Sequence, residues 1–194
     1  MAPWRSRREP PLLLDERRRL RDARRLYWIE RERSIAQWMH GAAAWPSVAL
    51  LLMIVSRLGD GALWYALIGT LPLWGGPTGM KSALYLVVLG GVNLVFYKAL
   101  KQSIARPRPF VSCPGIRACA PSLDEYSFPS GHTMHAVAFS LLLTHYHPGL
   151  AVPLWGFTAL IAVSRVVLGL HYPSDVAIGA AIGALTAGFM LFIV

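Results

Sequence analysis

Apolar residues dominate the chain from residue 41 onward and gather in six stretches separated by glycine- and proline-rich breaks. The stretches cover about 41–58, 61–75, 82–100, 132–148, 150–170 and 175–194. Several reach the roughly 17–25 residues that a helix needs to span the hydrocarbon core of a bilayer. Breaks such as Gly59-Asp60-Gly61, Gly75-Gly76-Pro77 and Tyr172-Pro173-Ser174 separate them. The pattern predicts an all-α integral membrane bundle of six helices.

Residues 1–40 have a different character from the rest of the chain. They hold 11 of the 19 Lys and Arg residues and 6 of the 10 acidic residues, which leaves 12 charges for residues 41–194. Only 15% of the whole chain is charged, against about 25% in soluble domains, and 55% is hydrophobic, which excludes disorder for most of the length. We therefore divide the chain into a basic juxtamembrane head, 1–40, and a membrane domain, 41–194.

The head has the composition of an amphipathic helix at a membrane surface. Arginines alternate with apolar side chains that include Leu20, Tyr27, Trp28, Ile35 and Trp38. Such a helix would lie on anionic headgroups, and a solvated charged helix is the alternative. The head has a net charge of only +5 and no nucleic-acid motif, so no nucleic-acid partner is expected.

The arginines of the head also predict an orientation. Because positive charge favours the cytoplasmic side, the head is expected to lie in the cytoplasm, and six spans would return the C-terminus to the same side. The loop 101–131 would then face the periplasm, although it carries four cations: Lys101, Arg106, Arg108 and Arg117. Cations on the disfavoured side of a membrane indicate an anionic ligand.

Three clusters of polar residues stand at the ends of predicted spans. They are Lys101 with Arg108-Pro109, then Pro129-Ser130-Gly131-His132, and then Ser164-Arg165 followed by His171 and Asp175. The first two share one loop, and the third is two spans further on, so all three should meet at one face of the membrane.

The cations and the helix start suit a phosphate group. Two guanidinium forks and one ammonium, from Arg108, Arg165 and Lys101, can hold one tetrahedral anion. Ser130 and Gly131 begin a predicted helix, where free backbone N–H groups and the positive end of the helix dipole favour an anion.

The two histidines suit two different roles in phosphoryl transfer. An imidazole can attack phosphorus when a carboxylate holds its far nitrogen, and Asp175 lies one turn from His171. His132 is then available to protonate the departing oxygen as general acid. His135 lies one turn after His132 and is expected to be structural.

The three clusters resemble the signature of the type 2 phosphatidic acid phosphatase superfamily. Its pattern is Lys-x6-Arg-Pro, Pro-Ser-Gly-His and Ser-Arg-x5-His-x3-Asp, and every fixed position matches in order between residues 101 and 175. The resemblance implies a phosphohydrolase that uses no metal and no cofactor. It implies His171 as nucleophile, Asp175 as its orienting group and His132 as acid. The implied phosphate-binding residues are Lys101, Arg108, Ser130, Gly131 and Arg165.

We accordingly expect a lipid phosphatase in the bacterial inner membrane, with the bilayer and a lipid phosphate as its partners. Undecaprenyl diphosphate ranks first as substrate, because an outward-facing site on a short chain suits recycling of a carrier lipid. Phosphatidylglycerophosphate, phosphatidic acid and lipid A are alternatives. A vanadium-dependent haloperoxidase relative would be larger and soluble. A transporter or flippase of anionic lipids would explain the cations but gives His171 no role.

Three further features of the sequence lead to expectations about a disulfide, helix packing and substrate access. Cys113 and Cys119 share one polar loop, and both a disulfide and two free thiols are compatible with their spacing. Gly179 and Gly183 predict a small-residue packing face on the last helix. Asp124 and Glu125 could gate substrates by charge repulsion.

Overall fold

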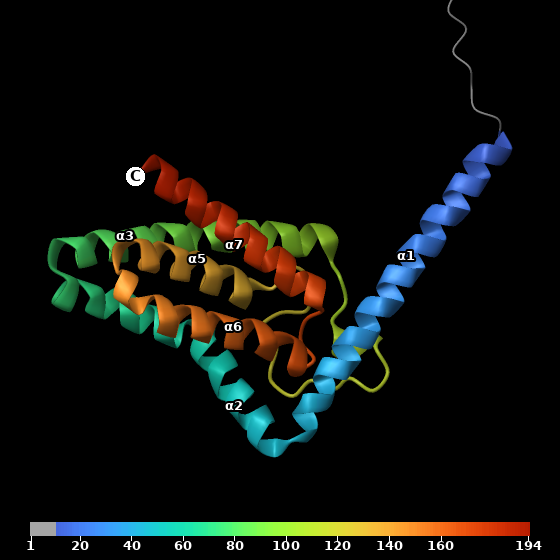
Figure 1. Ribbon diagram of the computed structural model, residues 1–194, viewed down its shortest axis with the longest axis horizontal. Coiled ribbons are helices and arrows are strands. Elements are labelled where there is room, and N and C mark those ends of the chain that lie inside the picture. The colour runs from blue at the N-terminus through green and yellow to red at the C-terminus, as the bar shows by residue number, and fades with distance from the viewer. Residues whose placement is uncertain (1–10) are drawn as a thin grey trace, which may run out of the picture.

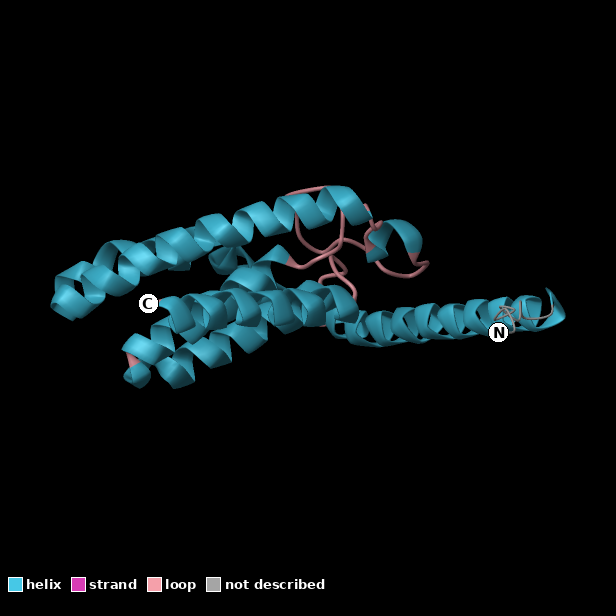
Figure 2. Cartoon of the chain, turned by 90° about the horizontal axis from the view of Figure 1, so that it is seen from above, coloured by secondary structure: helices cyan, strands magenta, loops and turns pink. Residues whose placement is uncertain are grey.

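The computed structural model describes residues 11–194, so the first ten residues of the head lie outside it. Within that range the chain forms helices, turns and loops and no strand (Figures 1 and 2). The elements are α1 (Pro11–His40), η1 (Gly41–Ala44), α2 (Pro46–Arg57), η2 (Leu58–Ala62), α3 (Leu63–Ile104), α4 (Pro109–Ser112), α5 (Gly131–Tyr146), η3 (Pro148–Leu150), α6 (Ala151–Val167) and α7 (Pro173–Ile193). The predicted all-α architecture is confirmed.

Helix α3 consists of two antiparallel arms that meet at Gly76. This residue has φ 55° and ψ −139°, a combination that side chains with a Cβ rarely adopt, and Pro77 follows it directly. The chain therefore reverses between 63–75 and 77–104, as Figure 1 shows at the end of the bundle away from α1.

Helix α2 and the first arm of α3 form one bent path rather than two spans. Gly61, in the π-helical turn η2, has φ 136°, and the chain bends there without reversing. Gly59 lies against Ile161 and near His132 at the start of α5, while Gly75 lies against His147 at its end. Residues 59–75 therefore run the whole length of α5.

The predicted count of six spans is thus not confirmed. The predicted stretches 41–58 and 61–75 are two halves of one path, 46–75, because the break at Gly59-Asp60-Gly61 is a kink instead of a loop. Four further paths cross the bundle: the second arm of α3, α5, α6 and α7.

Helix α5 is the central helix of the bundle. It packs against α7, α6 and α3, and its contact with α7 depends on glycine. A Cβ on Gly183 would lie 2.2 Å from the carbonyl oxygen of Met134, and one on Gly179 would lie 2.6 Å from that of Ser130. The predicted small-residue face on the last helix is confirmed, because a side chain at either position would push the two backbones apart.

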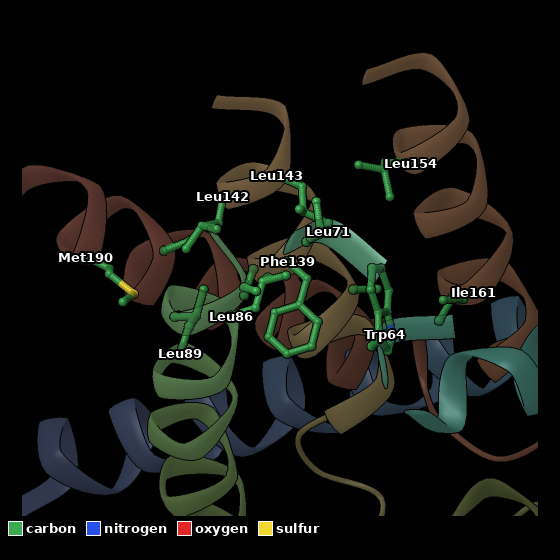
Figure 3. Packing of buried hydrophobic residues seen from close by; sticks show 14 of the residues in the cluster. Trp64, Leu71, Leu86, Leu89, Phe139, Leu142, Leu143, Leu154, Ile161 and Met190 are labelled. Carbon is green, nitrogen blue, oxygen red and sulfur yellow. The ribbon is translucent and has the colours of Figure 1, made fainter. Parts of the chain in front are cut away.

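The core lies between these helices, and the outside of the bundle is also apolar. Trp64, Phe139 and Ile161 meet in the core with the leucines that Figure 3 labels. Three stretches are long and apolar enough to cross a membrane: Pro46–Ser112, Pro148–Val167 and Pro173–Ile193. Helix α5 is shorter, with 16 residues, and most of its side chains are covered by its neighbours.

Helix α1 leaves the bundle at the end where the long loop 105–130 lies, while the C-terminus lies at the other end (Figures 1 and 2). Its last turns dock on that loop and on the start of α7, since Glu32 binds Arg106 and the backbone N–H of Ser174. With five paths, α1 and the C-terminus lie at opposite ends of the bundle (Figure 1). The side of the membrane on which each terminus lies stays a prediction.

The head is helical over residues 11–40, as predicted. Its outward face carries the exposed side chains of Leu20, Tyr27, Trp28, Ile35 and Trp38. The contact of this face with anionic headgroups stays a prediction.

The topology predicts which positions share a side of the membrane. In a Cys113→Ala/Cys119→Ala background, single cysteines placed by Ser34→Cys on α1 and Leu123→Cys in the long loop should react with a membrane-impermeant maleimide from the same side. A Val194→Cys label should react from the other side only. Labelling in detergent provides the control for reactivity. Reaction of the first two positions from opposite sides would contradict the five-path topology.

Candidate active site

The three predicted clusters meet at the end of the bundle that carries α1. Lys101 comes from the last turn of α3, His132 from the first turn of α5, Arg165 from the last turn of α6, and Asp175 from the first turn of α7. Arg108 and His171 lie in the connecting loops. Six of the eight predicted site residues are buried to at least 95%: Lys101, Arg108, Ser130, Arg165, His171 and Asp175.

The side chain of His171 is held in one tautomer by the backbone. Its Nδ1 lies 2.5 Å from the carbonyl oxygen of Ser127, which can only accept, so Nδ1 carries the proton. The lone pair therefore sits on Nε2, which lies 3.4 Å from Nη1 of Arg108. Burial, and then the positive charges of Arg165 and Arg108, lower the pKa of His171 well below its ordinary value. A neutral imidazole with an unprotonated Nε2 is the form that can act as a nucleophile.

Asp175 lies close to His171 without a direct hydrogen bond. Its Oδ2 is 3.8 Å from Nδ1 of His171 and accepts the backbone N–H of Tyr172 at 2.8 Å. Its Oδ1 accepts Nη1 of Arg106 at 2.8 Å. The orienting bond expected from Asp175 is thus supplied in this structure by the Ser127 carbonyl.

Two of the three predicted phosphate-binding cations, Lys101 and Arg108, bind a carboxylate of the chain itself. Asp124, from the long loop, accepts hydrogen bonds from Lys101, from Tyr97 and from Nη2 of Arg108, the last at 2.8 Å. Although burial alone would raise it, the hydrogen bonds from Lys101 and Tyr97 hold the pKa of Asp124 below its ordinary value. Asp124 is therefore ionised at neutral pH and occupies a position on the cations that an anionic ligand would take.

One N–H group of Arg165 has no acceptor in the described part of the chain. Its Nη1 donates to Ser56 on α2, while its Nε is buried and has no hydrogen-bond partner within residues 11–194. A buried guanidinium N–H without an acceptor is costly, and a bound anion is the group that would satisfy it.

His132 binds a carboxylate that the sequence interpretation missed. Its Nε2 contacts Asp60 of η2, because the kink places this residue inside the bundle instead of in an external loop. A carboxylate between two glycines in an apolar stretch was the available signal, since ionised groups at membrane depth usually have a function. His135 donates Nδ1–H to the carbonyl of Gly131 in its own helix, 2.9 Å away, and its structural role stays a prediction.

An apolar cavity of about 460 Å³ adjoins His132. Residues of the path 59–68, of α3 between 86 and 97, and of the first turns of α5 line it. Trp64, Leu86 and Leu94 make its walls largely apolar, while Asp60 and His132 form its polar end.

The two cysteines are free thiols in this structure. Cys113 is buried, with Sγ 3.1 Å from the hydroxyl of Tyr172, and Cys119 is partly buried. Of the two alternatives left open above, the structure therefore contains the thiols.

An apolar helical bundle with a buried cluster of cations at one end defines an integral membrane protein. Residues 81–194 match the family model of the PAP2 superfamily, and the chain belongs to that superfamily. This is the family that the motifs of residues 101–175 resemble, so the resemblance is confirmed.

The chain is similar to several named members of the family. Undecaprenyl-diphosphatase BcrC of Bacillus subtilis is 35% identical over 130 residues, which are 66% of each chain. Decaprenylphosphoryl-5-phosphoribose phosphatase of Mycobacterium tuberculosis is 39% identical over 85 residues, 44% of this chain and 46% of that one. The matches thus span less than two thirds of these relatives. The crystal structure of Aquifex aeolicus LpxE shares the fold, with a TM-score of 0.73 and 24% identity over 81% of this chain and 93% of that one.

The position of Asp124 leads to a prediction about phosphate affinity. Asp124→Asn removes the negative charge that competes for Lys101 and Arg108, so inorganic phosphate should bind more tightly. A partly exposed ion pair is worth up to about 1 kcal/mol, which corresponds to a fall of about threefold to fivefold in the dissociation constant of phosphate. Glu125→Gln, one residue further along the loop, is the control. Weaker binding of phosphate by the Asp124→Asn protein would show that Asp124 supports the anion site instead of competing with the ligand.

Proposed function

We propose that the protein is a lipid phosphatase that cleaves a phosphomonoester or diphosphate through a phosphohistidine at His171. The observation that carries the proposal is the state of the imidazole of His171: neutral, fixed at Nδ1, and with Nε2 beside Arg108. The membership of the chain in the PAP2 superfamily supports the same reaction class.

The reaction proceeds in two displacements. Nε2 of His171 attacks phosphorus, the bond from phosphorus to the leaving oxygen breaks, and His132 gives that oxygen a proton. Water then attacks the phosphohistidine and loses a proton to His132. The N–P bond breaks and inorganic phosphate leaves. Lys101, Arg108 and Arg165 neutralise the charge on the phosphoryl oxygens in both steps, and the start of α5 at Ser130 and Gly131 adds backbone N–H groups.

The surroundings of His132 favour a substrate with a hydrocarbon chain. The leaving oxygen must lie next to His132, and the apolar cavity begins there. The first carbons of a lipid would occupy that cavity while the phosphate lies among the cations. Undecaprenyl diphosphate, cleaved to undecaprenyl phosphate, is our first candidate, because a relative named as an undecaprenyl-diphosphatase aligns over 66% of this chain.

The proposed location is the bacterial plasma membrane, with the head and the site at one face. Of the eight Lys and Arg residues in 41–194, Lys81 alone lies at the other end of the bundle, where it stacks on Tyr85 and Tyr146. The arginines of the head add further positive charge at the end of the bundle that carries the site. The positive-inside rule therefore favours the cytoplasm for the site. The expectation of a periplasmic site rested on six spans, which the structure does not confirm.

The proposed chemistry predicts phosphate release that survives chelation. The purified protein should release phosphate from lipid substrate in excess EDTA, and His171→Ala should lower kcat by about 10³-fold or more, since loss of a nucleophile removes the reaction path. His145→Ala, on an exposed position at the far end of α5, should be unaffected. Full activity in the His171→Ala protein would overturn the assignment of the nucleophile. Loss of activity in EDTA, restored by a divalent cation, would overturn the metal-free mechanism.

A substrate panel tests the identity of the lipid. Undecaprenyl diphosphate, phosphatidylglycerophosphate, phosphatidic acid and lipid A should be compared on one preparation in one detergent. The first should have the highest kcat/KM, by about tenfold or more, which requires a difference of only about 1.4 kcal/mol in transition-state binding. A higher value for another lipid would transfer the assignment to that lipid. Binding of all four lipids without release of phosphate would favour the transporter class.

A further inference from the structure

Helix α1, from a region outside the matched family model, reaches the site through one carboxylate. Oε2 of Glu32 accepts Nη2 of Arg106 at 2.7 Å, and Oε1 accepts the backbone N–H of Ser174 at 2.9 Å. The side chain of Glu32 is only 18% exposed. It thus closes the first turn of α7 in the way that an N-cap residue does, but from another helix.

Arg106 connects this carboxylate to the site. Its Nη1 donates to Oδ1 of Asp175 and to Oγ of Ser174, both at 2.8 Å. The guanidinium also lies over the ring of Tyr172, 4.0 Å from its centroid. Two carboxylates, one ring and one hydroxyl therefore hold the planar group, a geometry that lysine could not reproduce.

The connection continues from Asp175 to His171. Oδ2 of Asp175 accepts the N–H of Tyr172, the residue that follows His171, so the carboxylate closes the turn on which the imidazole is mounted. A shift of Asp175 would move that turn, and Nε2 of His171 would leave its line of attack. Displacements of about 1 Å can lower rates by about 10²-fold.

We propose that Glu32 is a positioning residue of this phosphatase site, acting through Arg106 and Asp175 on the turn that carries His171. The inference rests on the proposed function, since it assigns His171 as the reacting group. It makes the head part of the active enzyme, with the docking of α1 required for full turnover. Although burial alone would raise it, the hydrogen bonds from Ser174 and Arg106 lower the pKa of Glu32, so the carboxylate is ionised at neutral pH.

The chain provides a matched control on the same helix. Glu30 precedes Glu32 by two residues, is exposed and pairs with Arg33 one turn further along, so Glu30→Gln changes the charge of α1 without touching the site. Glu32→Gln keeps the size of the side chain but has one acceptor oxygen in place of two, so it cannot accept both Arg106 and Ser174.

The test measures phosphate release from the same lipid by five proteins: wild type, Glu30→Gln, Glu32→Gln, Arg106→Gln and the double variant. Glu32→Gln should lower kcat by about tenfold and change KM by less than about twofold, because the lost contact orients the nucleophile without binding the lipid. Glu30→Gln should match the wild type. If Glu32 acts through Arg106, the double variant should be no slower than Arg106→Gln alone.

Hydrogen–deuterium exchange gives a second readout that does not depend on activity. In Glu32→Gln, the amides of Tyr172 and Ser174 should exchange faster than in wild type and in Glu30→Gln, while those of α5 should be unchanged. A Glu32→Gln protein with wild-type kcat would overturn the inference, and so would purely multiplicative losses in the double variant. If the wild type itself released no phosphate, the proposed function would fail instead, and exchange at 172–174 would still test the contact.

Discussion

Three cationic side chains are buried together at one end of a bundle that is otherwise apolar inside and outside. Moving one such ion out of water costs several kcal/mol, and placing three side by side adds their mutual repulsion. The surrounding structure supplies the compensation: Asp124 accepts from Lys101 and Arg108, the carbonyl of Leu170 accepts from Arg108, and that of Tyr126 accepts from Lys101. The long loop is therefore folded over the helix ends by the charge that it neutralises. Where the cations lack a partner, at Nε of Arg165, an anionic ligand can enter.

The sequence predicted which residues gather at one end of the bundle better than it predicted the number of spans. Fixed spacings between ionisable residues and span ends were enough to bring Lys101, His132 and Asp175 to one end of the bundle, because each cluster sits at a helix terminus. The prediction of six spans is not confirmed at Gly61, because the sequence signals a break there but the structure contains a bend. Glycine permits both outcomes, and the choice depends on packing against α5 and α6, which a single sequence does not reveal.

The contacts that sequence reasoning missed share one property. Glu32 and Ser174 are 142 positions apart, and Asp60 and His132 are 72 apart. Neither pair belongs to a local pattern, since a carboxylate in a charged helix or between two glycines looks like a solvated group or a turn residue. Such pairs become visible only when the topology is known, and the prediction of six spans had placed the head and the site on opposite faces of the membrane.

The hydrogen bond from Nδ1 of His171 to the carbonyl of Ser127 links the buried charges to the proposed chemistry. A backbone carbonyl at Nδ1 fixes the tautomer of the neutral ring, because it cannot take up a proton as a carboxylate can. When a phosphoryl group binds to Nε2, the ring becomes positively charged among three cations, and a neutral carbonyl offers little compensation. The carboxylate of Asp175 lies 3.8 Å from Nδ1 of this ring, and Arg106 on its other oxygen holds it in place. Asp175 then acts on the charged intermediate more than on the resting imidazole, which explains why it can stand outside hydrogen-bond distance before substrate arrives.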